Sequence, residues 1–510
     1  MNSSAEKKLG VILQYSQMAL SILISFIYTP IMLRILSQSQ YGIYNLANSI
    51  ISYLSLLSLG FGASYIRFYS RYKKGKNTAG IKRLNGLFLI AFLVIGTVAL
   101  VCGLFFSQNT LIFFNDTYTT EDLRVARVLM IFMSLNLALS FPTSVFTSYV
   151  TSQEKFVFQK LLNMVKTVAS PFFTLPVLLL GYGSIGMVIV TTVITVCVDM
   201  ANIFFCIFKL KMGFDFHRPD FKLLKEIAVF SSFIALNQVV DQINWATDKV
   251  VLGKVCSSAA VAVYAIGSQI NTYYLQFSTA ISGVFVPQVH RIVSSDKDEK
   301  SVNRQLTDIF TKVGRVQFII IMLILTGFTF FGKYFISKWV GEGYENAYYV
   351  ALLLIAPASM PLIQNLGLEI QRAKNMHQFR SFVYLGMAIL NVGISIFFAK
   401  RWGEVGAAFG TTISLVLANG LVMNIFYHKK IGIDIVYFWR EMAKFIPALI
   451  APVCMGILLN VKACKGLFDF AIRILVYIVV YTLSFYFIGM NGFEKKQVNK
   501  ILRKVKILKQ

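Results

Sequence analysis

The strongest constraint on the fold is a series of apolar stretches, each about as long as a lipid bilayer is thick. A bilayer core requires about 20 apolar residues per helix. By that measure the sequence predicts an all-α integral membrane protein with about 14 transmembrane helices. The expected spans are 9–33, 43–66, 84–106, 125–149, 161–182, 185–208, 226–247, 258–289, 312–332, 348–370, 381–399, 404–427, 442–460 and 468–490.

Composition leads to the same class. Of the 510 residues, 56% are apolar and 14% are charged, against roughly a quarter charged in soluble domains. The six cysteines lack paired spacing and mostly lie in apolar runs, which indicates small apolar side chains rather than disulfides or a zinc site. The four histidines are far apart in the sequence. We therefore expect no metal site and no cofactor.

The charges give the orientation. The net charge of +26 could indicate nucleic-acid binding. With the N-terminus in the cytosol, however, 37 of the 49 Lys and Arg fall in cytosolic segments, as the positive-inside rule expects. This asymmetry excludes the nucleic-acid class and predicts that both termini are cytosolic. The basic tail at 495–509 is expected to lie against anionic headgroups.

An internal repeat divides the chain. Spans 4–6 and 10–12 share an acidic external stretch, a proline-containing helix, a short polar cytosolic loop and a glycine break, at 181–186 and at 402–406. Such repeats are common in transporters. They predict two pseudo-symmetric six-helix lobes and an added C-terminal helix pair. The predicted divisions are 1–208, a cytosolic linker at 209–225, 226–427, and 428–510 with the extra pair and basic tail.

Polar residues form stripes along spans 1, 2, 7 and 8, and span 6 adds a further one that includes Asp199. In span 7, Asn237, Asp241, Asn244 and Asp248 recur at helical spacing and share one face. Arg34 and Arg67 stand at the outer end of span 1 and the inner end of span 2. These stripes predict the walls of a wet cavity. Its candidate residues are Gln14, Gln17, Arg34, Asn45, Asn48, Arg67, Asn237, Asp241, Asn244, Gln269 and Gln276.

The alternative interpretation of such stripes is hydrogen bonding between packed helices, which suits uncharged residues equally well. A carboxylate inside a span is costlier, at about 2.5–3.5 kcal/mol. Asp199 and Asp241 are therefore candidate ion-coupling residues. Asp248 and Lys249, adjacent at a span end, are expected to form an interfacial pair.

The sequence resembles the bacterial polysaccharide-transport flippases, of the oligosaccharide and O-antigen type, within the multidrug, oligosaccharidyl-lipid and polysaccharide exporter superfamily. The resemblance runs over nearly the whole length, through loosely defined motifs. These are TPIMLRILSQSQYGIYNLANSI (29–50), RFYSRYKKGK (67–76), DKVVLGKVCSSAAVAVYAIGSQI (248–270), PQVHRIV (287–293) and the breaks at Gly183 and Gly406.

The resemblance implies two lobes arranged as a V around a central cavity, in the bacterial cytoplasmic membrane. It also implies a substrate, a polyprenyl-pyrophosphate-linked oligosaccharide moved from the inner to the outer leaflet by alternating access. A polysaccharide polymerase and glycosyltransferases would be its partners. Arg34 or Arg67 could hold the pyrophosphate, because the arginine fork matches phosphate oxygens in pairs.

Two other functions stay open. Asp199 and Asp241 would suit a proton- or sodium-coupled exporter of small molecules, because a titrating carboxylate can couple ion and substrate movement. A membrane scaffold or a glycosyl-transferring enzyme is the third. An enzyme of that kind would be expected to carry a sizeable catalytic loop, whereas the segments between predicted spans are short. The sequence therefore predicts a transporter and not an enzyme.

Overall fold

The computed structural model describes residues 3–58, 60–217, 221–295, 298–376, 378–492, 494–496 and 498–499. These residues form helices joined by short loops, and no strand occurs within those ranges. Their contacts divide the chain into two compact units. The first comprises Met1–Ala265 and Ser395–Ala407, and the second comprises Ile266–Ile394 and Ala408–Gln510. The predicted all-α class is confirmed, whereas the predicted divisions at 208, 225 and 427 stay predictions.

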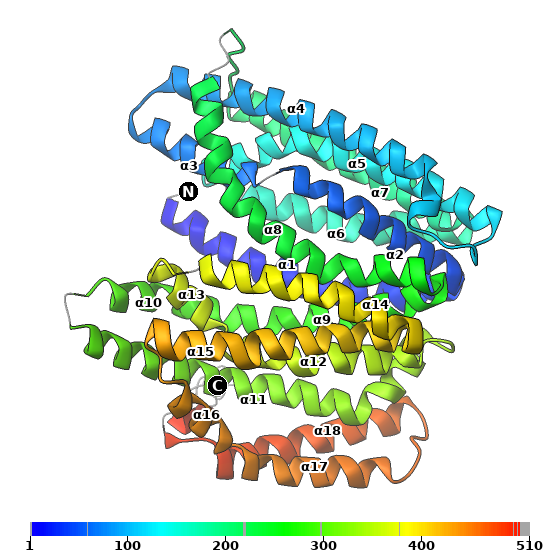
Figure 1. Ribbon diagram of the computed structural model, residues 1–510, viewed down its shortest axis with the longest axis vertical. Coiled ribbons are helices and arrows are strands. Elements are labelled where there is room, and N and C mark those ends of the chain that lie inside the picture. Colours follow the sequence, from blue (N-terminus) through cyan, green and yellow to red (C-terminus); the bar gives the residue numbers. More distant parts are fainter. Residues whose placement is uncertain are drawn as a thin grey trace, which may run out of the picture. The chain divides into compact units, whose positions relative to one another are not determined.

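In the first unit α4 packs along α5, α5 along α7, and α6 against both α1 and α7. These helices lie side by side in Figure 1. Shorter helices α2 and α3 pack against α5 and the long helix α8. The helices of this unit are α1 (Ser3–Ile35), α2 (Gln38–Tyr53), α3 (Phe61–Lys74), α4 (Thr78–Gln108), α5 (Thr120–Ser152), α6 (Phe156–Leu179), α7 (Gly183–Phe204), α8 (Phe221–Val255) and the first residues of α9 (Ser258–Ser282).

The second unit is built around α11, which packs against α12, α13, α16, α17 and α18. Figure 1 shows α17 and α18 as a neighbouring pair. Its core combines aliphatic side chains with many aromatic ones, among them Phe310, Phe438 and Phe485. Its further helices are α10 (Val286–Val293), α11 (Glu299–Val340), α12 (Asn346–Ile363), α13 (Leu366–Ala373), α14 (Gln378–Leu415), α15 (Asn424–Phe426), α16 (Ile435–Ala443), α17 (Ile446–Asn460) and α18 (Leu467–Ser484).

The expected number of spans is not confirmed in full. Ten helical segments of the described chain are long and apolar enough to cross a membrane, and the pair α16 and α17, bent by 42°, adds an eleventh. Predicted spans 11 and 12 form one of these segments, Gln378–Ile431. Helices α8 and α9, which contain most of predicted spans 7 and 8, are not among them. These two helices carry polar stripes, and polar residues lower mean hydropathy.

Three predicted spans differ from the structure in their bounds. Span 2, expected as one helix over 43–66, is broken between α2 and α3. Span 8, expected over 258–289, ends as α9 at Ser282, and the separate helix α10 follows. Span 9 was expected over 312–332 and lies inside the longer α11, because the charged residues before it continue the helix without a break. The glycine break at 402–406 is confirmed by non-helical Trp402 and Gly403 inside α14.

Candidate functional site

The candidate site in the first unit begins at the break between α2 and α3. Gly60 has φ +70°, in the left-handed region that glycine tolerates and other residues rarely adopt. A Cβ atom there would lie 2.5 Å from the Cγ2 atom of Ile234 on α8. The backbone therefore approaches α8 more closely than any side chain would allow. Broken helices of this kind commonly form the binding sites of transporters.

On both sides of this break, hydrogen bonds join α2 and α3 to α8. Ser64 and Ser231 hydroxyls lie 2.6 Å apart and are both buried. Nearer the other end, the Gln242 amide donates to the Ser52 hydroxyl, and the Tyr53 and Thr247 hydroxyls are hydrogen-bonded. We call these three pairs, Ser52–Gln242, Tyr53–Thr247 and Ser64–Ser231, the polar seam.

The polar seam joins polar residues of predicted spans 2 and 7, through partners that the sequence does not single out. Gln242 and Thr247 lie beside Asp241 and Asp248 in the chain and were not selected. Helical spacing identified one face of α8, whereas the contact with α2 involves neighbouring positions. Their only signal in the sequence was a high density of polar residues across 237–248.

The predicted cavity residues on α2 and α8 are not members of the polar seam. The Asn45 amide donates to the Tyr41 carbonyl of its own helix at 2.9 Å. Asn48 and Asp241 are exposed, and Asn244 is half-buried. The side chain of Asn237 lies outside the described residues. The seam thus uses other side chains and leaves several of the predicted polar groups accessible.

The predicted residues on α1 and α3 lie in the same unit. Gln14 and Arg34 are exposed, and Gln17 is half-buried. Arg67 is also exposed, and the carbon at the centre of its guanidinium lies 4.1 Å from the centroid of the Phe230 ring on α8. A cation over an aromatic face is attracted by the ring quadrupole. This contact positions Arg67 while its hydrogen-bond donors stay at the surface.

The two other acidic residues that the sequence singled out have different surroundings. Asp199 on α7 is half-buried and accepts a hydrogen bond of 3.1 Å from the Thr143 hydroxyl on α5. Asp248, expected to form an interfacial pair with Lys249, is only 1% exposed and accepts a hydrogen bond from the Tyr264 hydroxyl. Its pairing with Lys249 at the membrane interface stays a prediction. Among the described residues, no three His, Cys, Asp or Glu side chains are placed to hold a metal ion.

Gln269 and Gln276, the remaining candidates, belong to the second unit. Both lie on α9 and are half-buried. The Gln269 amide donates to the Tyr273 hydroxyl at 2.6 Å, one turn along the same helix. These residues therefore present a short polar strip on α9. Their role in a cavity stays a prediction.

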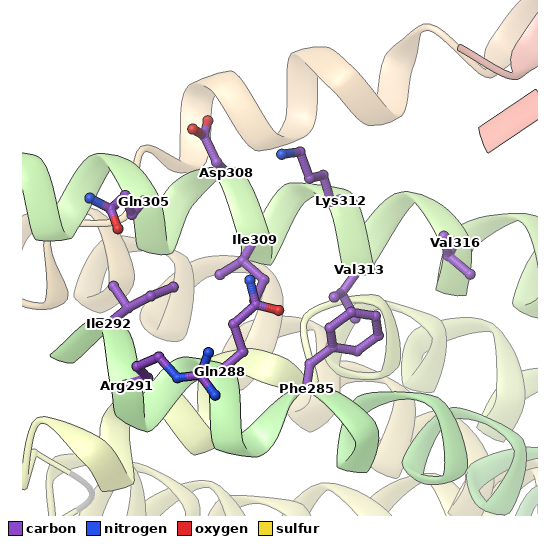
Figure 2. Close-up of a pocket in the computed structure, with 10 residues that line it drawn as sticks. All are labelled: Phe285, Gln288, Arg291, Ile292, Gln305, Asp308, Ile309, Lys312, Val313 and Val316. Carbon is purple, nitrogen blue, oxygen red and sulfur yellow. The ribbon is translucent and has the colours of Figure 1, made fainter. Parts of the chain in front are cut away.

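The second unit also contains a cavity of about 500 Å³ between α10 and the first turns of α11 (Figure 2). It is lined on one side by residues of α10 and the turn before it, and on the other by residues of α11. Its wall contains both apolar and charged side chains. The lining residues are Phe285, Gln288, Arg291, Ile292, Gln305, Asp308, Ile309, Lys312, Val313 and Val316.

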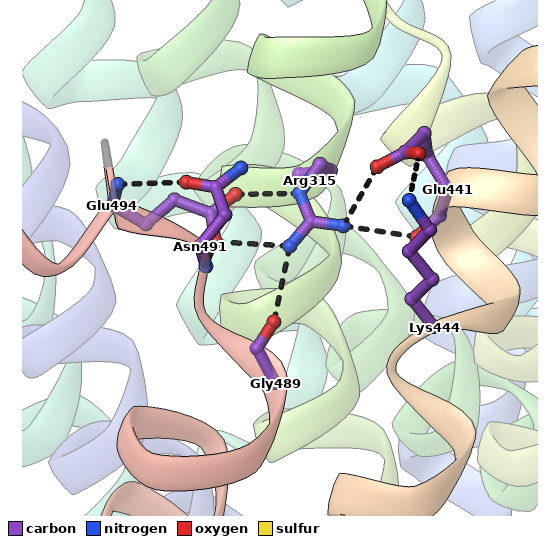
Figure 3. A network of polar contacts seen from close by, with 6 residues as sticks. All are labelled: Arg315, Glu441, Lys444, Gly489, Asn491 and Glu494. Carbon is purple, nitrogen blue, oxygen red and sulfur yellow. Dashed lines mark hydrogen bonds and ion pairs between the residues drawn. The ribbon is translucent and has the colours of Figure 1, made fainter.

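A buried charge network joins α11 to the C-terminal helices in the second unit (Figure 3). Arg315, 4% exposed, donates to Glu494 at 2.6 Å and to Glu441 at 3.3 Å. It also donates to the backbone carbonyl of Gly489 at 3.1 Å and lies over the Phe445 ring at 4.3 Å. We call Arg315, Glu441 and Glu494 the arginine anchor. Every part of the guanidinium is engaged, so the anchor stabilises packing and leaves no group for a ligand.

These features define an all-helical, multi-pass membrane protein with a broken, glycine-hinged helix beside a polar seam. Solved structures with a similar fold include a flippase and several multidrug transporters. A structure described as lipid II flippase MurJ in an inward closed conformation matches with a TM-score of 0.73 and 15% identity, covering 93% of this chain and 97% of that one. An inward-facing multidrug resistance MATE transporter of the MOP superfamily gives 0.63 and 12%, covering 83% and 96%.

The Vibrio cholerae MATE transporter VcmN, in its bent form, gives a TM-score of 0.53 and 14% identity, covering 86% of this chain and 99% of that one. No curated protein matches the sequence significantly. The model of the family described as polysaccharide biosynthesis protein matches residues 10–293, more than half of the chain. The chain belongs to this family.

Proposed function

We propose that this protein is a flippase, which moves a polyprenyl-pyrophosphate-linked oligosaccharide from the inner to the outer leaflet by alternating access. The observation that carries the proposal is the family match over residues 10–293, which include α1, α2, α3 and α8 with their accessible polar side chains. The fold shared with a lipid II flippase supports it. The proposed location is the bacterial cytoplasmic membrane, with both termini in the cytosol and an ion gradient as the driving force.

In this proposal the uncharged polar residues contact the sugar head and the lipid tail stays in the bilayer. Amide and hydroxyl groups such as those of Gln14 and Asn48 can both donate and accept hydrogen bonds. Arg67, exposed at the predicted inner side of the membrane, would bind the pyrophosphate before translocation. Arg34, exposed at the predicted outer side, would bind it afterwards. Asp241 and Asp199 would couple the movement to an ion. Transport of this kind requires no bond to be made or broken by the protein.

The test is a deletion strain with no related transporter, in which lipid-linked repeat units should accumulate in the inner leaflet and surface polysaccharide should disappear. The deletion strain complemented with the Arg67→Gln variant should export about tenfold less polysaccharide, or still less, than the strain complemented with wild type. The reason is that charge-assisted hydrogen bonds contribute about 1.5–3 kcal/mol. Arg67→Lys should restore export only partly, because an ammonium cannot bind phosphate as a planar fork.

The matched control is Arg124→Gln on α5, which removes a similarly exposed charge whose nearest carboxylate, Glu121, is 3.8 Å away. That variant should export normally. Normal polysaccharide export in the deletion strain would contradict the proposal. Co-purification of the protein with glycosyltransferases or a polymerase would support the proposed partners.

A second candidate function is a proton- or sodium-coupled exporter of small molecules, favoured by the fold match to multidrug transporters and by half-buried Asp199. Asp241→Asn and Asp199→Asn should then abolish drug efflux and its pH dependence. If both variants keep efflux and its pH profile, this candidate is wrong. Loss of drug efflux with intact polysaccharide export would favour it over the flippase.

A further inference from the structure

The cavity between α10 and α11 lies where α11 changes from a charged to an apolar helix. Its lining on α11 runs from Gln305 to Val316, a rise of about 16 Å along the axis. Charged residues recur up to Arg315, whereas 316–332 carry none. Such a transition marks the boundary between headgroups and hydrocarbon. The cavity therefore spans the depth at which a lipid headgroup meets its acyl chains.

Two cations stand at this cavity. Arg291 and Lys312 are both exposed, and neither forms an ion pair with any residue that the structure describes. Asp308, one turn before Lys312, partly offsets them, so the charged lining has a net charge of +1. Figure 2 shows Asp308 and Lys312 projecting from the side of α11 that faces away from α10, whereas Gln288 reaches from α10 toward α11. Arginine, lysine and a glutamine amide together provide donors suited to phosphate oxygens.

The remaining wall is apolar. Ile309 and Val313 are buried in α11, and Phe285 and Ile292 are half-buried on the opposite side. In Figure 2 the Phe285 ring lies next to Val313. A volume of about 500 Å³ is within the range of ligand pockets and far exceeds that of a lone phosphate ion. The cavity therefore offers both cationic side chains and an apolar wall, which suits a ligand with an anionic group and a hydrocarbon chain.

We infer that this cavity binds the phosphate headgroup and first acyl carbons of an anionic phospholipid from the cytosolic leaflet. The predicted orientation puts residues 290–315 on the cytosolic side, where anionic lipids are concentrated. Arg291 and Gln288 of α10 bind the phosphate, Lys312 adds positive charge at the edge of the cavity, and the apolar wall covers the start of the chains. The site is independent of transport, so a protein that fails as a flippase would still bind the lipid.

The test uses the purified full-length protein in detergent, titrated with phosphatidylglycerol or phosphatidylcholine, with bound lipid counted by native mass spectrometry. The wild type should bind one tightly held phosphatidylglycerol in preference to phosphatidylcholine. The variant R291Q/K312Q should lose about fivefold in affinity per cation, the effect of roughly 1 kcal/mol for each basic residue near a charged membrane surface. Asp308→Asn should increase affinity by a similar factor.

The matched control is K300Q/R304Q, which removes two exposed cations of α11 that do not line the cavity. It should bind phosphatidylglycerol within twofold of wild type. Val316→Phe fills the cavity without changing charge and should weaken binding several-fold. Size-exclusion profiles matching wild type would show that each variant is folded.

Five results would overturn the inference. The first four are equal loss in the control variant, equal binding of phosphatidylcholine, weaker binding in Asp308→Asn, and unchanged affinity in Val316→Phe. Inorganic pyrophosphate is the last probe. If it displaced the lipid at equal concentration, the cavity would be a simple anion site and the acyl chains would contribute nothing.

Discussion

The polar seam of the first unit and the arginine anchor of the second join helices through different kinds of polar contact. In the first, the polar seam between α2, α3 and α8 consists of neutral hydrogen bonds, such as Ser64 with Ser231 at 2.6 Å. In the second, the arginine anchor ties α11 to the C-terminal helices with buried charges, including the 2.6 Å contact of Arg315 with Glu494. Neutral hydrogen bonds between membrane helices contribute little individually. A broken buried ion pair is costly. We therefore expect the polar seam to separate at a lower cost in free energy than the arginine anchor.

The largest effect is expected from breaking the arginine anchor. Arg315→Ala leaves Glu441 and Glu494 without their guanidinium, and should lower the free energy of unfolding by about 3–5 kcal/mol. Denaturant titration in detergent micelles would measure the loss. Lys444→Ala is the control, because Lys444 binds the same Glu441 but is 59% exposed. Its cost should stay below about 1 kcal/mol. If both variants lost the same amount, the anchor would be no stronger than a surface pair.

The helix break beside the polar seam should show an intermediate effect. Gly60→Ala puts a side chain in the left-handed region and against Ile234, at a cost of about 1–3 kcal/mol. Gly62→Ala, two residues away, is the control, because a Cβ there meets only ordinary contact with Ser148 at 3.6 Å. Alanine inside helix α3 should be neutral or stabilising by up to about 1 kcal/mol. Thermal unfolding of the two variants in detergent would compare them, and equal stabilities would mean that the break does not need glycine.

The smallest effect is expected within the polar seam. A double-mutant cycle with Ser64→Ala and Ser231→Ala should give a coupling energy of about 0.6 kcal/mol. Ser70→Ala with Ser231→Ala is the control cycle, because Ser70 is exposed and donates to the Ile66 carbonyl of its own helix. That cycle should give no coupling. A coupling energy above about 2 kcal/mol for Ser64 and Ser231 would contradict the expectation that the contacts of the polar seam are much weaker than those of the arginine anchor.

Features formed by residues close together in the sequence could be predicted more often than features formed by distant residues. The break at Trp402 and Gly403 was predicted, because glycine and its neighbours signal a turn locally. The break at Gly60 was not, because apolar residues continue on both sides and hydropathy does not register a backbone angle. The polar stripes were predicted from helical spacing.

Partners between distant segments were beyond the sequence. Arg315 and Glu494 are separated by 179 positions, and no local pattern relates them. The same holds for Gln242, whose contact with Ser52 depends on how α8 is rotated against α2. Spacing along one helix gives the faces it presents, whereas the choice of neighbour is a property of the folded protein. This is why the polar faces of single helices could be predicted and the hydrogen-bonded pairs between helices could not.

The sequence separation within the arginine anchor has a consequence for biosynthesis. The carboxylate of Glu494 is translated 179 residues after the guanidinium it binds. At a translation rate of about 5–20 residues per second, Glu494 is synthesised roughly 10–35 s after Arg315. Chains that stop short of residue 494 keep an incompletely neutralised cation between membrane helices. The buried charge network of this unit is therefore complete only after residue 494 has been made.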